Sequence, residues 1–99
     1  MSRLKDILIG KTISKIIPIE DYLQIFFADG SILNLNNKTT FSHQFQHFYN
    51  ETINDLIITN DVICIKANDK EIAMSMKEED YYSPEAFEFC SENEEWIVG

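Results

Sequence analysis

The sequence predicts a mainly β protein: a single domain of six to eight antiparallel strands in a curled sheet or an open barrel, with little helix. Three observations lead to this fold class. Apolar residues alternate with polar ones over short runs, turn sequences separate the runs, and one stretch of the chain recurs 40 residues later. With 99 residues, the chain is long enough to bury one hydrophobic core.

The recurring stretch predicts a domain built from two repeats of about 40 residues. When residues 12–36 are aligned with residues 52–76, seven of the 25 columns are identical, and the turn columns coincide as well as the apolar ones. A fixed period of this kind is typical of a supersecondary unit that is used twice. We therefore expect this organisation along residues 1–99: repeat one at about 10–36, a connector at 37–51, repeat two at about 52–76 and a C-terminal hairpin at 77–99.

The N-terminal residues predict a short helix before repeat one. Leu4, Ile7 and Leu8 are spaced as on one face of a helix, and Gly10 follows as a residue that ends helices. We expect one or two helical turns here.

Repeat one predicts three strands: residues 12–17, 22–27 and 31–36. The proline-containing sequence PIED at 18–21 separates the first two. In the second strand Leu23, Ile25 and Phe27 alternate with other residues, which predicts one buried face. Gly30, in the sequence ADGS, predicts a hairpin turn because glycine accepts the positive φ that such turns require.

Repeat two predicts the same three strands, and the alternation is visible again at Ile63 and Ile65. Lys70 occupies the position that corresponds to Gly30. Since Asn and Asp tolerate the left-handed conformation better than Lys, we expect Asn68 or Asp69 to adopt it in this hairpin.

The connector leaves two interpretations open. Phe41, Phe45, Phe48 and Tyr49 have the spacing of a helix, with Thr40 as a candidate N-cap, but alternate residues from 41 to 49 fit a strand equally well.

The residues after repeat two predict two elements. Pro84 fits the first turn of a short helix that has Ser83 as its N-cap. The last residues fit a closing hairpin around the sequence SENE at 91–94.

The formal net charge of −9 is distributed unevenly along the chain. Residues 1–50 carry four acids and five bases, which sum to +1, whereas residues 51–99 carry thirteen acids and three bases, which sum to −10. A surface of this sign argues against direct binding to nucleic acid. It favours a basic protein partner, although such charge also serves solubility alone.

The expected location is the cytoplasm. No apolar run approaches the length that spans a bilayer, and the N-terminal residues lack the features of a signal peptide. Cys64 and Cys90 are interpreted as buried thiols in a reducing compartment, not as a disulfide framework.

Tests for chemistry predict no catalytic residue, no metal site and no cofactor. His43 and His47 have the i,i+4 spacing of two metal ligands on a helix, but only Glu51 lies nearby as a third ligand, so a polar face is the better interpretation. Neither cysteine has a neighbouring cation or histidine that would lower its pKa. The acidic clusters lack the spacing and central glycine of a calcium loop. We therefore expect a protein that is not an enzyme.

The acidic C-terminal region predicts a partner-binding surface. Tyr81 and Tyr82 follow three consecutive acids, and tyrosine supplies a large amphipathic contact area at low entropy cost. The alternative is that both rings cover the open end of the barrel while the acids keep the chain soluble. The predicted contact residues are Glu78, Glu79, Asp80, Tyr81, Tyr82, Glu85 and Glu88.

Four motifs carry a resemblance to a known group of proteins: GKTI at 10–13, ADGSIL at 28–33, YYSPEAF at 81–87 and EEWIVG at 94–99. With these motifs the chain resembles the small β-rich immunity proteins of bacterial polymorphic toxin and contact-dependent growth inhibition systems. The resemblance implies an antitoxin role: a protein that does no chemistry and binds a cognate toxin, in many cases a nuclease with a basic cleft.

The leading hypothesis is therefore a cytoplasmic immunity protein, a monomer or a weak dimer, that blocks the basic active-site cleft of a toxin nuclease. One alternative is an acidic mimic of nucleic acid that inhibits a DNA-binding protein. Another is a structural β module in which residues 96–98 pair with a second copy as an edge strand.

Overall fold

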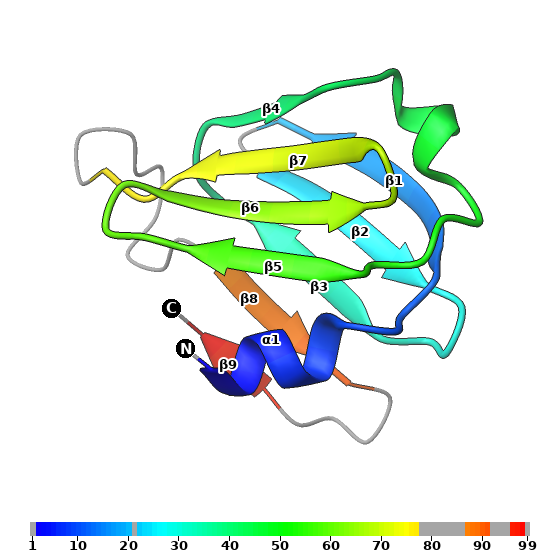
Figure 1. Ribbon diagram of the computed structural model, residues 1–99, viewed down its shortest axis with the longest axis horizontal. Helices are drawn as coiled ribbons and strands as arrows, with labels where there is room; N and C mark the ends of the chain where they lie inside the picture. Colours follow the sequence, from blue (N-terminus) through cyan, green and yellow to red (C-terminus); the bar gives the residue numbers. More distant parts are fainter. Residues whose placement is uncertain (1, 21, 78–86, 92–95, 99) are drawn as a thin grey trace.

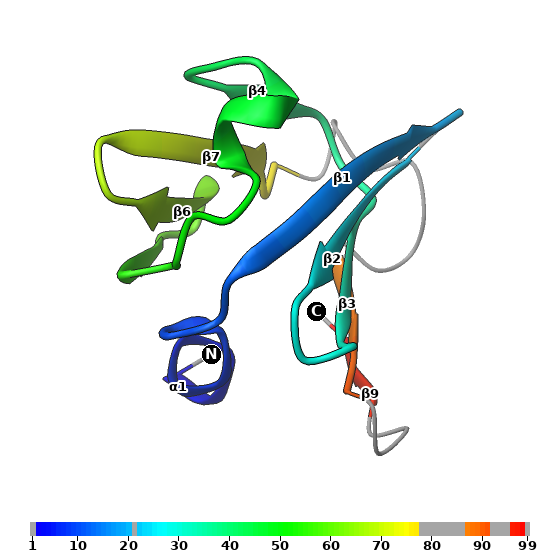
Figure 2. The same cartoon turned by 90° about the vertical axis from the view of Figure 1, so that its right-hand side faces the viewer.

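The computed structural model describes residues 2–20, 22–77, 87–91 and 96–98. Two antiparallel sheets face each other across one hydrophobic core (Figure 1, Figure 2). The prediction of a mainly β, antiparallel protein is confirmed. The predicted single curled sheet or open barrel is wrong, because the described strands form two separate sheets. These strands number nine, more than the predicted six to eight, because the connector also contributes a short strand.

The five-stranded sheet has the strand order β1-β2-β3-β8-β9. Its strands are β1 (Ile13–Ile19), β2 (Tyr22–Phe27), β3 (Ile32–Leu35), β8 (Phe87–Cys90) and β9 (Trp96–Val98). The four-stranded sheet has the order β4-β7-β6-β5. Its strands are β4 (Thr39–Phe41), β5 (Asp55–Ile58), β6 (Val62–Ala67) and β7 (Lys70–Ser75).

Each sheet includes strands from the other half of the chain. After β3 the chain crosses to the four-stranded sheet, where β4 pairs with β7. The strand that follows β7 along the chain, β8, lies in the five-stranded sheet and pairs with β3. The five-stranded sheet therefore consists of β1–β3 plus β8 and β9 from the second half of the chain, and the four-stranded sheet consists of β5–β7 plus β4 from the first half. This exchange ties the two layers together.

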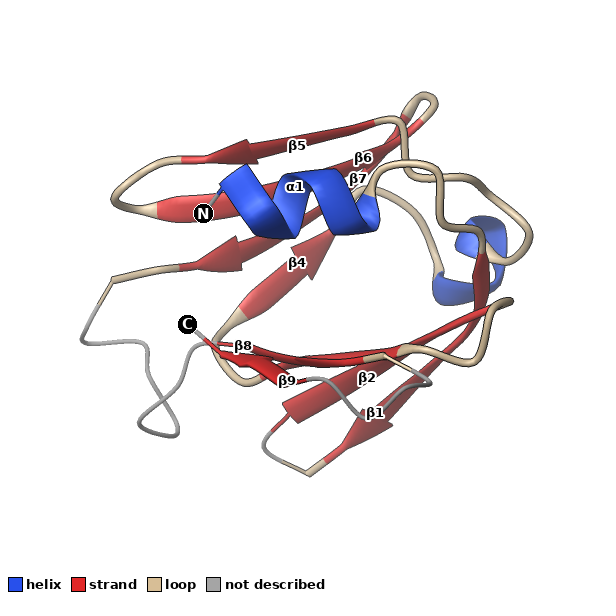
Figure 3. Cartoon of the chain, turned by 90° about the horizontal axis from the view of Figure 1, so that it is seen from below, coloured by secondary structure: helices blue, strands red, loops and turns tan. Residues whose placement is uncertain are grey.

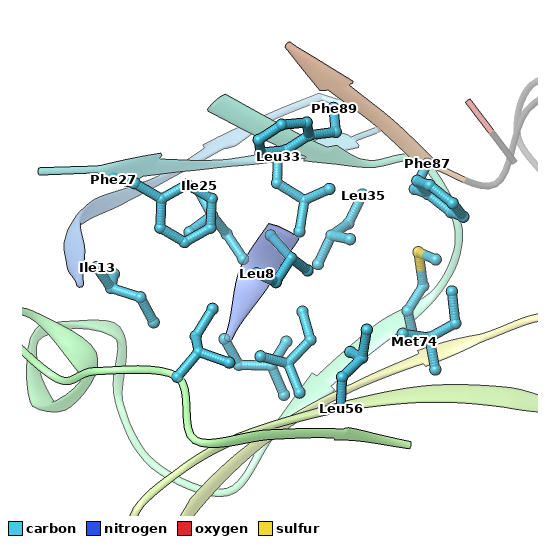
Figure 4. Packing of buried hydrophobic residues seen from close by; sticks show 14 of the residues in the cluster. Leu8, Ile13, Ile25, Phe27, Leu33, Leu35, Leu56, Met74, Phe87 and Phe89 are labelled. Atoms are coloured by element: carbon cyan, nitrogen blue, oxygen red, sulfur yellow. The ribbon is translucent and has the colours of Figure 1, made fainter. Parts of the chain in front are cut away.

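The core lies between the sheets and is closed by the N-terminal helix. Alternate residues of the central strands point inward; Ile25, Leu33 and Ile65 are at most 2% exposed. Helix α1 (Ser2–Leu8) lies beside β5 at one open side of the sandwich (Figure 3), and Leu8 sits among side chains from both sheets (Figure 4). The predicted N-terminal helix is confirmed, and Gly10 follows it with φ of 93°.

The two halves meet at a corner where backbone hydrogen bonds occur in pairs related by 40 residues. Thr12 and Thr52 form an antiparallel bridge, and their Oγ1 atoms are 3.1 Å apart. The amide of Gly10 donates to the carbonyl of Ile53 at 2.8 Å, and the amide of Asn50, 40 residues after Gly10, donates to the carbonyl of Ile13 at 2.7 Å. Asn50 also has a positive φ, of 68°. The corner therefore has local twofold symmetry.

The two hairpins differ by one residue, which corrects the gapless alignment used above. In β2–β3, Phe26 pairs with Ile32, and Gly30 adopts φ of 91° in the turn. In β6–β7, Lys66 pairs with Glu71, so the second loop is one residue shorter. The aligned residues Ile32 and Ile72 therefore point to opposite sides: Ile32 is partly exposed, whereas Ile72 is 1% exposed.

The shorter loop also explains Lys70. Lys70 does not replace a turn glycine but is the first residue of β7, where it pairs with Ala67. Asn68 adopts the left-handed conformation with φ of 60°, as predicted for one of the two loop residues.

Two further predictions are corrected or resolved. Pro18 does not end the first strand: β1 continues to Ile19, and proline is tolerated because β1 is an edge strand. The connector contains both β4 and a 3₁₀ helix, η1 (Phe45–Phe48), so each of its two interpretations applies to one part of it.

The predicted C-terminal pairing is present as β8–β9. The predicted helix at Ser83 and Pro84 lies outside the described residues.

Candidate interaction surface

Of the predicted contact residues, only Glu88 is described by the structure. It lies in β8, directly opposite Asn34 of β3, on the side of the sheet that faces away from the core. Phe87 and Phe89, its neighbours along the strand, point inward and are 1% and 2% exposed. The others lie outside the described residues: Glu78, Glu79, Asp80, Tyr81, Tyr82 and Glu85.

The side of the five-stranded sheet that faces away from the core, called here the outer face, is largely apolar. No described helix or strand covers this side (Figure 2). Strand pairing sets Phe26 opposite Ile32, and Ile32 opposite Cys90, in one row across three strands. All three are partly exposed, and neither Phe26 nor Ile32 packs against the core. Ile17 of β1 adds a further apolar side chain, opposite Gln24.

A polar row lies next to the apolar one on the outer face: Gln24, Asn34 and Glu88 are successive partners across β2, β3 and β8. Asn36 Nδ2 donates to Glu88 Oε1 at 3.1 Å, which holds this carboxylate over the end of β3. Asn34 Oδ1 is a buried acceptor without a hydrogen-bond donor among the described residues. An unpaired buried acceptor of this kind costs free energy in the folded state.

The corresponding side of the four-stranded sheet combines ion pairs with a short apolar row. Lys66 Nζ lies 3.5 Å from Glu71 Oε1 across the β6–β7 pair. Lys5 of α1 lies 3.5 Å from Asp55 of β5. The next row contains Ile57, Cys64 and Ala73, of which Ile57 is 40% exposed. Its charges are therefore neutralised within the chain, whereas the outer face of the five-stranded sheet has apolar side chains at comparable positions.

The net charge belongs almost entirely to residues that the structure does not describe. The described residues carry nine acids and eight bases, which sum to −1; the remaining residues carry eight acids and no base. Seven of these eight acids are in segments 78–86 and 92–95, one preceding and one following β8 in the chain. The acidic segments are thus covalently joined to the two ends of a strand of the apolar outer face.

The two cysteines lie one on each sheet and are both free thiols. Cys90 is in the apolar row of the outer face, and its Sγ donates to the carbonyl of Ser91 at 3.4 Å. Cys64 is on β6, opposite Ala73. Partial burial, with a further contribution from the nearby carboxylate of Glu71, raises the pKa of Cys64, so neutral thiol is its resting form.

His43 and His47 do not lie on one face of a helix, the arrangement that their spacing would give to two metal ligands. Only His47 lies in η1, a single 3₁₀ turn, so the two imidazoles do not share a face of an α-helix. The rings are tilted by 54° with centroids 6.1 Å apart, and His43 Nδ1 lies 2.7 Å from Ser42 Oγ. Within the described ranges, no three His, Cys, Asp or Glu side chains are grouped as metal ligands.

A surface hollow of about 430 Å³ lies between the end of α1 and the β2–β3 turn. Its charged residues, Lys11 and Asp29, pair with each other. Partial burial alone would raise the pKa of Asp29, but hydrogen bonds from Lys11 and Ser31 outweigh it and hold the pKa at about 2, below the ordinary 3.8. The amide and the hydroxyl of Ser31 both donate to Asp29 Oδ1, at 2.9 and 2.5 Å. This pair stabilises the turn.

The apolar outer face was not predicted from the sequence, although the sequence contains a signal for it. Phe26 and Phe27 are consecutive, so in a strand they must point to opposite sides. One of the two rings therefore had to lie on the side away from the core.

Comparisons with family models, curated proteins and solved structures give no match. In the described part of the chain, no helix has the length and apolar character needed to cross a membrane.

Proposed function

We propose that this chain is an immunity protein that binds and neutralises a cognate bacterial toxin, a nuclease, by blocking its basic active-site cleft. The observation that carries the proposal is the segregation of charge. Seven acids and no base occur in the two segments joined to the ends of β8, while the rest of the chain, apart from Asp21, is close to neutral.

The physical mechanism is competition with nucleic acid. A nuclease cleft must present positive potential to bind phosphates, and an acidic protein surface is attracted to the same potential. Complementary charge raises the association rate and excludes incorrect partners, while buried contacts at the centre of the interface set the dissociation rate. Tyr81 and Tyr82, between the acids, are the predicted aromatic contacts.

We also infer that the two halves are copies of one unit, which supports the assignment of segment 78–86 to function. The hydrogen-bond pairs at the Thr12–Thr52 corner and the positions of β2 and β6 are related by 40 residues. The connections that follow are not alike: residues 36–38 join β3 to β4, whereas residues 76–86 join β7 to β8. The longer connection contains the acids and tyrosines, so the added length is the natural place for a binding role.

The first experiment is co-expression of the chain with the toxin domain encoded beside its gene, followed by calorimetric titration of the purified pair. The wild-type chain is expected to restore growth and to bind. Glu85→Lys combined with Glu88→Lys should raise Kd by roughly tenfold or more, because both carboxylates would then repel a basic cleft. Tyr82→Ala should raise Kd by a similar factor through loss of aromatic contact.

The matched control changes the same amount of charge elsewhere. Asp6 on α1 and Glu20 after β1 are both exposed, so Asp6→Lys with Glu20→Lys shifts the net charge equally. If this control weakens binding as much as the Glu85/Glu88 variant, net charge alone acts and the proposed surface is wrong. Growth that the wild-type chain does not restore would overturn the immunity role itself.

A further inference from the structure

The two sheets contain structurally equivalent cross-strand pairs of opposite chemistry. Phe26 and Ile32 are paired one position before the β2–β3 turn, and Lys66 and Glu71 are paired one position before the β6–β7 turn. Both pairs lie on the side away from the core, as the burial of the next residues, Phe27 and Ala67, shows. The same scaffold position therefore accepts an ion pair without difficulty, and folding alone does not require an apolar pair at Phe26 and Ile32.

We propose that the outer face of the five-stranded sheet, centred on Phe26 and Ile32, is where an apolar side chain of the basic protein partner docks. This inference rests on the proposed function and specifies the part of the surface that gives the complex its affinity. Interfaces derive most of their binding energy from a few buried apolar and aromatic contacts, and acidic rims mainly steer association. The outer face has an apolar centre, and the chain that precedes and follows its strand β8 is acidic, which matches this composition.

Charge decides which partner occupies the face. A second copy of this chain would bring another net charge of −9 against the acids joined to β8, which opposes a face-to-face dimer. A basic surface is attracted instead, and it carries an excess of N–H donors. Charge complementarity therefore selects a basic protein surface as the partner.

The ring of Phe26 already accepts a cation. Lys15 Nζ lies 4.7 Å from the ring centroid, and Lys15 is the residue opposite Phe26 on the edge strand β1. A guanidinium or ammonium group of the partner can make the same interaction with this ring. The structure therefore favours a partner whose apolar anchor is flanked by Arg or Lys.

The test substitutes the apolar pair without changing net charge. In Phe26→Glu combined with Ile32→Lys, the new carboxylate lies between Lys15 and the new lysine, so the strand register and solubility are preserved. The probe is the purified toxin domain that the wild-type chain neutralises. Kd is expected to rise roughly 30-fold or more, as for loss of a central aromatic contact. The matched control exchanges the other pair, Lys66→Glu with Glu71→Lys, and should leave Kd within about twofold.

The wild-type chain offers a second measurement that does not depend on how the variant folds. Cys90 lies in the apolar row of the outer face and Cys64 on the opposite sheet, so alkylation by N-ethylmaleimide, read by mass spectrometry, reports on both faces in one sample. Saturating toxin domain should slow labelling of Cys90 at least tenfold relative to the free chain and leave Cys64 unchanged.

The outcomes separate this inference from the proposed function. If Glu85→Lys with Glu88→Lys weakens binding while Phe26→Glu with Ile32→Lys does not, or if Cys90 stays as reactive as in the free chain, the inference is wrong and the proposed function stands. Protection of Cys64 in place of Cys90 would assign the contact to the four-stranded sheet and overturn the inference. A wild-type chain that does not bind the toxin domain overturns both.

Discussion

The strands β1-β2-β3 and β5-β6-β7 are the same three-stranded arrangement in the two sheets, and they differ most on the sides that face away from the core. Inward positions hold apolar residues in both: Ile25 and Ile65 are 0% and 2% exposed. Outward positions diverge, with an apolar pair at Phe26 and Ile32 and an ion pair at Lys66 and Glu71.

This difference separates what the fold requires from what it permits. Inward side chains must fill one shared core at the density of a close-packed solid, so size and polarity are constrained in both halves. Outward side chains meet only water or a partner, and several chemistries are compatible with the same backbone. The apolar pair at Phe26 and Ile32, where the other sheet has an ion pair, therefore calls for an explanation by binding.

The largest expected effect concerns the positions at which the halves should behave alike. Leu8 and Phe48 are 40 residues apart and are both 0% exposed. Each lies shortly before the segment of its half that forms the Thr12–Thr52 corner. Leu8→Ala should lower the free energy of unfolding by about 2–5 kcal/mol and Phe48→Ala by about 3–5 kcal/mol, because each leaves a cavity in the core.

Urea denaturation followed by circular dichroism measures both values. Exposed Ile9→Ala, next to Leu8, is the control and should change the free energy of unfolding by less than about 1 kcal/mol. A loss below about 1 kcal/mol for either core variant would show that the two halves do not support the core in the same way.

The sequence was informative wherever structure follows from local pattern. Alternation located β2 at residues 22–27 and its inward residues Leu23, Ile25 and Phe27, because the side-chain period of a strand is a local property. The left-handed residue in the second hairpin and the end of α1 shortly before Gly10 followed from residue chemistry in the same way.

Features that depend on which distant segments pair with each other could not be predicted from local sequence patterns. The exchange of β4 and β8 between the sheets is decided by which strands pair, and no turn motif specifies that. The shorter second loop was hidden because Ile32 and Ile72 match without a gap, although the two residues face opposite sides. The charge pattern directed attention to residues 78–88, while the apolar outer face depends on neighbours from four strands.

A smaller effect should distinguish the two hairpin loops through pH. Asp29 accepts hydrogen bonds from Lys11 and Ser31, which hold its pKa at about 2 against 3.8, whereas the side chain of Asp69 in the other loop is 79% exposed. A lowered carboxyl pKa stabilises the fold above the unfolded value of 3.8, and this stability is lost as pH falls through about 2. Since the Asp29 side chain is 49% exposed, solvent screening reduces the contribution to about 1 kcal/mol.

Thermal or urea unfolding between pH 2 and pH 7 tests this comparison. Asp29→Asn should lose about 1 kcal/mol relative to the wild-type chain at pH 7 and converge with it near pH 2. Asp69→Asn is the matched control and should differ less at every pH. An Asp29→Asn deficit that is independent of pH would mean that packing, not the charge, stabilises the first loop.

The smallest effect lies at the corner where the halves meet. Thr12 Oγ1 and Thr52 Oγ1 are 3.1 Å apart, and both residues pair through the backbone in an antiparallel bridge. Valine retains the β-branched shape and the backbone bonds but removes the hydroxyl contact. In a double-mutant cycle of Thr12→Val and Thr52→Val, we expect a coupling of about 0.5 kcal/mol in the free energy of unfolding, the size of a partly solvated hydrogen bond. Pairing Thr12→Val with Thr40→Val, whose hydroxyl bonds the carbonyl of Ala73 instead, should give additive losses. If the losses of free energy are additive in both cycles, the two hydroxyls contribute independently to stability. The halves would then be coupled at the corner through the backbone hydrogen bonds alone.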